Sequence, residues 1–261
     1  MDLVVDISNW QGAISAALVN CWGTQGVRRV IVQAVNPGPG FPAGQTREQL
    51  QACKDAGMPS DCYVFFWDDQ DPAVAENAMG LAEGFDVGYW WGDYEDDRRM
   101  TPCVDEILAF AKACDIDGVY TRRDWWEARA GNTSDLSHMM LWDAHWDRDT
   151  NPAANFTPYG GWTTRTLKQF GSGNLCGASG LDMNVINQEV FVPPAAYVGD
   201  DYWAKFGPSG NDSLTNRYDW SGVAANLEGI ISQVMQRTQA PDTECEAKMT
   251  QIQDILFGTV K

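Results

Sequence analysis

Short apolar segments that alternate with helical segments are the feature of this 261-residue chain that most constrains its fold. The apolar segments have the length and composition of buried strands, and most segments between them have the apolar spacing or the capping residues of helices. The expected strands are Leu3 to Ile7, Val30 to Ala34, Cys62 to Trp67, Val87 to Trp91, Gly118 to Tyr120, Met139 to Trp146, Thr166 to Phe170 and Leu181 to Ile186. This alternation predicts an α/β fold, and we expect a (β/α)-barrel of the TIM type whose last strands lack helices.

A pair of carboxyl groups follows the strand expected at Val87 to Trp91, inside the acidic and aromatic stretch Asp86 to Asp97. Because side chains in a strand alternate between its faces, Asp93 and Glu95 are expected on one side, with α-carbons about 6.5 Å apart, and Tyr94 on the other. Hydrolysis of a glycosidic bond needs two neighbouring carboxyls, one that holds a proton and one that stays charged. In an arbitrary acidic chain the same Asp-X-Glu pattern is more often a solvated turn.

Further polar or aromatic side chains at or near the ends of the expected strands are Asp6, Asp68, Trp142 and Asp182. Barrel enzymes place their chemistry at the carboxyl ends of the strands. Asp6 lies inside an apolar strand, where a lone acid is costly unless it lines a polar site or is paired. We therefore expect these side chains to converge with the carboxyl pair on one face of the barrel.

Composition narrows the class of ligand. The formal net charge is −18 and the pI is near 4.3, which argues against a nucleic-acid partner because binding of a phosphate backbone needs basic patches. A neutral or cationic polymer suits this charge better. Sugar rings stack on aromatic faces, so a few of the twelve tryptophans are expected at a ligand and the others in the core.

Cysteine and histidine usage argues against a disulfide framework and against a metal centre. Seven cysteines are scattered without a Cys-X-X-Cys spacing, which fits buried thiols made in a reducing compartment. Only His138 and His145 are available as imidazole ligands, so we expect no metal and no cofactor. The segment Met1 to Asp6 has neither a basic leader nor a long apolar run, so we expect synthesis in the cytoplasm without a signal peptide, and no membrane span.

Seven short motifs follow one another along the chain. They are Val5-Asp6-Ile7-Ser8 with Gln11-Gly12, Gly26-Val27 with Val30-Ile31-Val32-Gln33-Ala34, Ala56-Gly57 with Tyr63-Val64-Phe65-Phe66, Asp93-Tyr94-Glu95, Leu141-Trp142-Asp143-Ala144, Lys168-Gln169-Phe170 and Leu181-Asp182-Met183-Asn184. In this order they resemble the glycoside hydrolase family 25 lysozymes, the Chalaropsis-type muramidases of fungi, bacteria and many phages. Each motif is weak alone, but together they cover roughly residues 3 to 187.

The resemblance implies a flattened barrel of parallel and antiparallel strands that cleaves the bond between N-acetylmuramic acid and N-acetylglucosamine in peptidoglycan. It makes Glu95 the acid and base of the reaction. Asp93 would orient the substrate N-acetyl group or stabilise an oxocarbenium-like centre, and Asp6 and Asp182 would complete the acidic floor. A covalent nucleophile and the substrate's own acetamide both remain open as the route.

The side chains assigned to substrate binding, again by the resemblance, are Tyr63, Trp67, Trp142, Gln169 and Asn184. The chain departs from the family at Val64, where the family usually has histidine, and at Val35 to Gly38, where it usually has an acidic segment with glycine. We expect these departures to affect contacts with the glycan and to leave the acid pair unchanged.

The composition changes after Phe191 to Pro194, and a polar stretch from Gly199 to Asn216 precedes two helical segments, Val223 to Gln239 and Thr243 to Phe257. We expect a catalytic barrel at residues 1–194 and a polar linker with a small C-terminal helical appendage at residues 195–261. Each of these helices has an apolar stripe that needs a packing surface, either on the barrel or on another chain in a homo-oligomer or a virion.

Two functions compete. The first is a phage-encoded or bacterial muramidase whose partner is the peptidoglycan glycan strand, and which reaches the cell wall on lysis or as part of a virion. The second is a catalytically silent barrel that binds glycans as a structural or adhesion module of a phage tail. Both carboxyls of the acid pair, Asp93 and Glu95, are present, which favours the enzyme.

Overall fold

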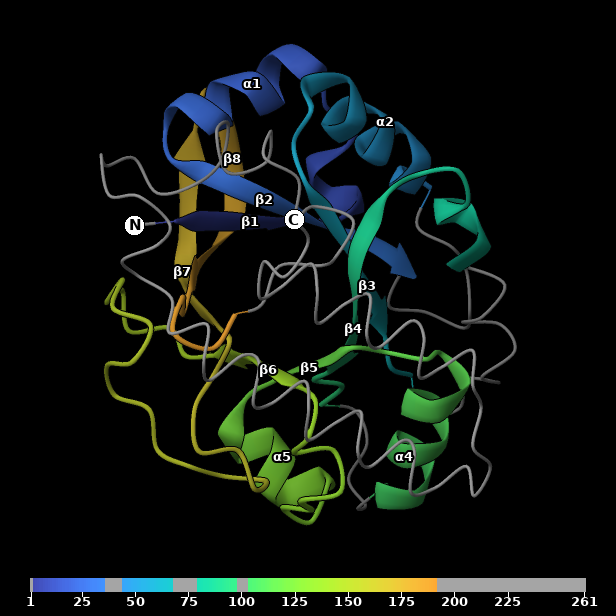
Figure 1. Ribbon diagram of the computed structural model, residues 1–261, viewed down its shortest axis with the longest axis vertical. Helices are drawn as coiled ribbons and strands as arrows, with labels where there is room; N and C mark the ends of the chain where they lie inside the picture. Colours follow the sequence, from blue (N-terminus) through green and yellow to red (C-terminus); the bar gives the residue numbers. More distant parts are fainter. Residues whose placement is uncertain (1, 36–43, 68–78, 98–102, 192–261) are drawn as a thin grey trace, which may run out of the picture. The chain divides into compact units, whose positions relative to one another are not determined.

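Eight strands close into one barrel within the part of the chain that the computed structural model describes, residues 2–35, 44–67, 79–97 and 103–191 (Figure 1). In barrel order the strands are β1 (Leu3–Ile7), β2 (Val27–Val35), β3 (Ser60–Phe65), β4 (Val87–Tyr94), β5 (Gly118–Thr121), β6 (Met140–Ala144), β7 (Leu167–Leu175) and β8 (Ala178–Ile186). The pairs from β1 to β7 are parallel, whereas β8 runs antiparallel to both β7 and β1 and so closes the barrel. The expected α/β barrel is confirmed, and so is its mixture of strand directions.

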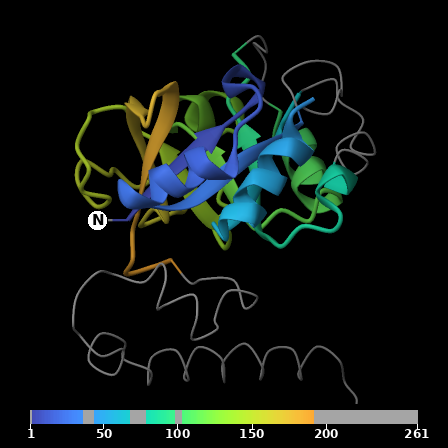
Figure 2. The same cartoon turned by 90° about the horizontal axis from the view of Figure 1, so that it is seen from above.

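Helices cover the outside of the barrel (Figure 1, Figure 2). They are α1 (Ala16–Thr24) after β1, α2 (Thr46–Ala56) after β2, α4 (Val104–Ala113) after β4 and α5 (Arg123–Arg129) after β5, with the short 3-10 helices η1 (Asn9–Gln11) and η2 (Gly80–Ala82). The connections that follow β6 and β7 contain no helix, as the sequence predicts. None of the described helices is long and apolar enough to cross a membrane.

Side chains that alternate along the strands produce two hydrophobic layers. Outward-facing residues pack under the helices, as Tyr94 does against Phe110, with ring centroids 5.9 Å apart. Inward-facing aromatic residues fill the barrel, and the rings of Trp91 and Trp142 lie 5.7 Å apart, edge to face. Gly118 leaves room for the Trp91 ring, because a β-carbon at this position would overlap the indole. The interior of the barrel is therefore a packed core and not a channel.

A buried ion pair closes the amino end of the barrel. The side chains of Arg29 on β2 and Asp61 on β3 form a salt bridge, and neither is accessible to solvent. Asp61 also accepts hydrogen bonds from the Tyr89 amide at 2.9 Å and from Trp91 Nε1 at 3.4 Å, and the Phe191 ring centroid lies 5.4 Å from Arg29 Cζ. Because an unpaired buried charge is costly, these contacts fix the relative position of β2 and β3.

The long connection between β6 and β7 contains no helix, and ion pairs of two buried cations hold it against the barrel. Arg165, only 1% exposed, pairs with Asp143 on β6, with Nη1 and Oδ2 2.5 Å apart. It also donates hydrogen bonds to two backbone carbonyls of the connection itself. Lys168 on β7 is fully buried, and its Nζ lies 2.7 Å from Oδ1 of Asp147. These two ion pairs hold the exit loop of β6 close to the barrel.

A disulfide attaches the β7–β8 hairpin to α1. The hairpin turns at Cys176 and Gly177, whose φ angles of 54° and 85° are both positive, as a two-residue turn between twisted strands requires. Cys176 is bonded to Cys21 on α1, and their α-carbons are 6.1 Å apart. The expectation of thiols without a disulfide is therefore wrong for this pair. No spacing motif marks the pair, because 155 residues separate the two cysteines and only the closed barrel brings them together.

The other cysteines of the described ranges are buried thiols, as the sequence predicts. The buried thiols are Cys53, Cys62, Cys103 and Cys114. Cys245 lies outside the described residues, and so do Asp68 and the linker and helical appendage expected at residues 195–261. The boundary near residue 194 and the role of the appendage stay predictions.

We expect the double variant Cys21→Ser/Cys176→Ser to melt roughly 10 °C below the wild type, because a link across so long a stretch of chain restricts the unfolded state. Differential scanning fluorimetry with and without dithiothreitol measures this difference. Reductant should lower the melting temperature of the wild type to that of the double variant and leave the double variant unchanged. Equal melting temperatures of the oxidised wild type and the double variant would contradict a stabilising disulfide.

Candidate active site

Four carboxyl side chains lie at the carboxyl end of the parallel strands. Asp6 faces inward from β1 and Asp93 from β4, and Glu95 follows directly after β4. Asp182 on β8 stands opposite Asp6 in the antiparallel pairing of β8 with β1. Tyr94, between Asp93 and Glu95, is buried in the outer layer, so the alternation expected for this stretch is present. The structure thus brings together the four acids that the sequence predicts.

Burial raises the pKa of each of these acids, and repulsion from neighbouring carboxylates adds to the effect for Asp6, Asp93 and Glu95. Asp6 is 8% exposed, and burial followed by the charge of Asp182 raises its pKa to about 7. Burial raises the pKa of Asp182 to about 6. The pKa of Asp93 is raised by burial first, and then by Glu95 and Asp6. Since carboxyls that interact this closely titrate as a group, the site retains protons at near-neutral pH.

Glu95 differs from the other three acids because a cation lies near it. Burial raises the pKa of Glu95, whereas Arg122 and a hydrogen bond from Tyr120 lower it. Arg122 follows β5 and pairs with Asp97, with Nη2 and Oδ1 2.5 Å apart. Both the protonated and the charged form of Glu95 therefore have support in the structure, which is what a group that alternates between acid and base needs.

Two carboxamides hold Asp6 in position. Asn184 Nδ2 at 2.8 Å and Gln169 Nε2 at 3.1 Å both donate to Oδ2 of Asp6. Asn184 in turn accepts a hydrogen bond from Trp142 Nε1 at 2.7 Å. Trp142 and Gln169 are each 2% exposed, and Asn184 is fully buried. In the structure these three side chains support the acids from within the barrel, and their expected contact with substrate stays a prediction.

The remaining two residues assigned to substrate binding come from β3 and its exit. Tyr63 is buried inside the barrel, with its ring 6.3 Å from that of Trp142, and its pKa is raised by burial and then by Asp93. Trp67 is half-buried, and its ring lies 6.1 Å from that of Phe65. Tyr63 adjoins the acids, whereas Trp67 lies beyond the end of β3, and substrate contact stays a prediction for both.

Two further side chains join this network, and neither is among the site residues predicted from the sequence. The Tyr120 hydroxyl lies 2.9 Å from Oε1 of Gln169 and 3.4 Å from Oε2 of Glu95. Trp146 Nε1 donates to the same Gln169 oxygen at 2.7 Å, although the Trp146 side chain is 59% exposed. Tyr120 had a signal, since it pairs with Asp93 across β4 and β5 and so faces the same way. Trp146 had none, because its position depends on the packing of an irregular loop.

Two buried oxygen atoms near the acids have no hydrogen-bond partner among the described residues. They are Oδ1 of Asp93 and Oε1 of Gln33, whose side chains are 5% and 3% exposed. Gln33 pairs with Tyr63 across β2 and β3, on the inner face of the barrel. A buried acceptor without a donor is destabilising, so each of these atoms needs a donor from outside the described residues.

One departure from the family pattern lies away from these groups. Val64, where the family usually has histidine, is fully buried in the outer layer between the barrel and the helices. The expectation that this position changes contacts with the glycan is therefore wrong, because the side chain faces away from the acids. Residues 36–38 of the second departure lie outside the described ranges.

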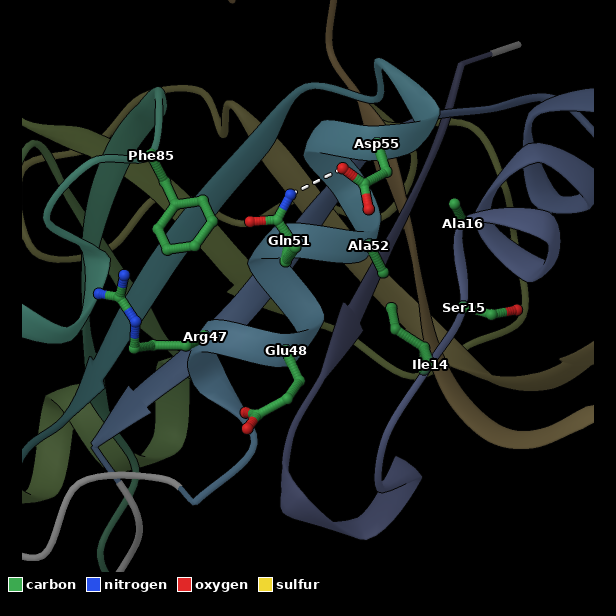
Figure 3. A pocket seen from close by; sticks show the side chains of 9 residues that line it. All are labelled: Ile14, Ser15, Ala16, Arg47, Glu48, Gln51, Ala52, Asp55 and Phe85. Carbon is green, nitrogen blue, oxygen red and sulfur yellow. Dashed lines mark hydrogen bonds between the residues drawn. The ribbon is translucent and has the colours of Figure 1, made fainter.

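A cavity of about 520 Å³ lies on the outer surface beside α2 (Figure 3). Its lining residues are Ile14, Ser15, Ala16, Arg47, Glu48, Gln51, Ala52, Asp55 and Phe85. The Arg47 guanidinium lies over the Phe85 ring, and Gln51 donates a hydrogen bond to Asp55 at 2.7 Å. None of the four acids of the barrel lines this cavity, so we assign it no part in their chemistry. Among the described residues, no cluster of three His, Cys, Asp or Glu side chains could hold a metal ion.

Comparison with known proteins gives the class to which this barrel and its acids belong. Residues 5–174 match the family described as Glycosyl hydrolases family 25, and the chain therefore belongs to that family. Asp6, Asp93 and Glu95 fall within the matched residues, and Asp182 follows them.

Individual relatives share parts of the chain. Counting factor 45-1 of Dictyostelium discoideum is 31% identical over an alignment of 179 residues, which covers 60% of this chain and 58% of that protein. Probable GH family 25 lysozyme 3 of the same organism is 28% identical over an alignment of 195 residues, which covers 69% of this chain and 40% of that protein. The chain thus spans about half the length of these curated relatives. The solved muramidase from Acremonium alcalophilum is 19% identical with a TM-score of 0.59, covering 79% of this chain and 99% of that one, which shows a shared fold.

We expect Asp6→Asn to raise the melting temperature by several degrees at pH 8 and to leave it unchanged at pH 4. The pKa of Asp6 rises from 3.8 to about 7 on folding, so its stabilising contribution is complete below pH 3.8 and is lost as the pH rises through 7. Thermal unfolding of the wild type and the variant between pH 4 and 8 tests this, with Asp55→Asn on the exposed face of α2 as the matched control. A variant that is less stable than the wild type at pH 8 would contradict it.

Proposed function

We propose that this chain is a peptidoglycan muramidase, which hydrolyses the glycosidic bond between N-acetylmuramic acid and N-acetylglucosamine. The observation that carries the proposal is the group of four interacting acids, Asp6 and Asp93 buried and Glu95 and Asp182 half-buried, at the carboxyl end of the barrel in a member of glycosyl hydrolases family 25. Relatives that are named lysozyme or muramidase support this substrate class.

In this proposal Glu95 donates a proton to the glycosidic oxygen and then, as a carboxylate, accepts a proton from the attacking water. Burial favours the protonated form of Glu95 at the start of the reaction. Arg122 and the Tyr120 hydroxyl stabilise the carboxylate that remains after the proton has left. A single side chain thereby supplies both proton transfers.

Asp93 supports the charge that develops on the sugar. One of its carboxylate oxygens has no partner within the described residues, so it is available to the substrate. Positive charge develops at the anomeric centre, or at the acetamide if that group attacks. This charge favours the ionised form of Asp93, which burial and the neighbouring acids otherwise oppose, and the carboxylate stabilises either distribution. Asp6 interacts with Asp93 and Glu95, Asp182 interacts with Asp6 and Glu95, and the two share the remaining protons of the site.

The alternative expected from the sequence is a silent barrel that binds glycans in a phage tail. Loss of the acid pair would favour this alternative, but Asp93 and Glu95 are both present and their pKa values are both raised, by burial first. If this protein bound peptidoglycan but released no fragments from it, the silent glycan-binding barrel would become the favoured function.

Further expectations belong to this proposal. We propose a TIM-type barrel in which β8 is reversed, with residues 195–261 as a helical appendage that packs on the barrel or on a partner in an oligomer or a virion. We also propose that the protein is made in a cytoplasm and acts at a cell wall, which it reaches after lysis or as part of a virion. The Cys21–Cys176 disulfide is compatible with action outside the cell, where the environment is oxidising.

We expect Glu95→Gln to abolish nearly all wall hydrolysis without unfolding the protein, because the amide keeps the shape of the side chain and loses the transferable proton. Loss of turbidity of purified cell walls measures the rate, and mass spectrometry of the released ends identifies the bond that is cut. The matched control is Glu48→Gln on the exposed face of α2, which should retain full activity. Substantial hydrolysis by folded Glu95→Gln protein would remove Glu95 from its role.

We expect Asp93→Asn to reduce the hydrolysis rate by about a hundred-fold or more, on the scale of losing one preorganised electrostatic stabiliser. The rate is measured with the same walls, and circular dichroism verifies that the variant is folded. Asp55→Asn on α2 is the matched control and should behave as the wild type. A near-normal rate in Asp93→Asn would transfer the stabilising role to Asp6 or Asp182.

A further inference from the structure

The Tyr120 hydroxyl stands between two acceptors that belong to different parts of the site. It is 2.9 Å from Oε1 of Gln169 on β7 and 3.4 Å from Oε2 of Glu95 after β4. A phenol carries a single hydrogen, so it can donate to only one of these oxygens at a time. Tyr120 is 7% exposed, which leaves water little access as a third partner.

The orientation of the Gln169 carboxamide is fixed by its other partners. Its Nε2 donates to Asp6 at 3.1 Å, and its Oε1 accepts from Trp146 Nε1 at 2.7 Å as well as from Tyr120. A rotated carboxamide would place its oxygen against the Asp6 carboxyl and its nitrogen against the Trp146 donor. Oε1 of Gln169 therefore stays an acceptor for Tyr120 while the state of Glu95 changes.

The two protonation states of Glu95 demand different partners from Tyr120. Protonated Glu95 can donate to the phenol oxygen, while the phenol hydrogen is directed to Gln169. Once Glu95 has lost its proton it is only an acceptor, and its negative charge attracts the phenol hydrogen. Gln169 then keeps the hydrogen bond from Trp146, so its oxygen is not left without a donor.

We propose that Tyr120 is a positioning residue that follows the protonation state of Glu95, by turning its single hydrogen between the Glu95 carboxyl and the Gln169 carboxamide. The inference rests on the proposed function of Glu95 as acid and base. No proton leaves Tyr120, whose pKa burial raises well above its usual value, so the phenol only rotates its O–H bond. The exchange stabilises the carboxylate at the stage when the proton has passed to the leaving sugar.

Other charged groups also shift the pKa of Glu95, so a test of the Tyr120 hydrogen bond must leave them unchanged. These groups are Asp93 and Asp97 on its own segment, Arg122 after β5, Asp182 on β8 and Asp6 on β1. Substitution of any of them would change the net charge of the site. Tyr120→Phe leaves all of these charges in place and removes only the hydroxyl, so it isolates the hydrogen bond.

The test is titration of the Glu95 side-chain carboxyl by carbon-13 NMR in the full chain without substrate. In Tyr120→Phe the midpoint should rise by about 0.5 to 1 pH unit, because the carboxylate loses a donor that is somewhat long at 3.4 Å. The alkaline limb of kcat should move in the same direction, with little change in KM. Tyr89→Phe, at the other end of the barrel interior, is the matched control and should leave the Glu95 midpoint unchanged.

A double-mutant cycle tests the connection through Gln169. Trp146→Phe removes the other donor to Oε1 of Gln169, which then competes more strongly for the phenol hydrogen and raises the Glu95 midpoint by a smaller amount. In the Tyr120→Phe background the same change should have no effect. An unchanged midpoint in Tyr120→Phe, or an equal shift by Trp146→Phe in both backgrounds, would overturn the inference. The titration needs no turnover, so it decides the matter separately from the hydrolysis assays that test the proposed function.

Discussion

The antiparallel pairing of β8 with β1 is the constraint on which the acidic site depends. This pairing closes the barrel and places Asp182 opposite Asp6. It also places Asn184 within hydrogen-bonding distance of the Asp6 carboxyl. A strand that ran in the other direction would present a different set of residues to Asp6. The disulfide between Cys21 and Cys176 attaches the turn of this hairpin to α1, so the strand that completes the site is also covalently restrained.

Bringing four acids together, two of them buried and two half-buried, opposes folding, and the barrel compensates with neutral donors. Gln169 and Asn184 donate to Asp6, which lowers its pKa against the larger effects of burial and Asp182. Carboxamides have no charge that would fix the acids in their ionised form, as a buried arginine would. The acids can therefore keep protons that a reaction uses, and the protein is less stable at neutral pH than the same fold with neutral side chains would be.

How much of this could be predicted from the sequence depends on the range of the interaction. Alternation within one strand is local, and it gave the shared face of Asp93 and Glu95 and the opposite direction of Tyr94. The disulfide of Cys21 could not be predicted, because its partner is distant in sequence and the pairing depends on barrel closure. The burial of Trp142 depends on rings from β3, β4 and β5 that surround it, and one strand alone does not reveal them. The network around Gln169 unites β1, β5 and the loop after β6, which no single motif contains.

The two ends of the barrel interior differ in how their acids are compensated, and only the carboxyl end carries the acids of the proposed function. At the amino end Arg29 neutralises Asp61 within a solvent-inaccessible pair. At the carboxyl end, no lysine, arginine or histidine of the described ranges forms an ion pair with any of the four acids. Burial outweighs the effect of the nearby Arg122 on the pKa of Glu95, so a carboxylate that forms among these acids is not neutralised by an ion pair and can stabilise positive charge that arises nearby. In the proposed hydrolysis, cleavage of the glycosidic bond generates positive charge on the sugar, so the compensating charge would appear only as the substrate reacts.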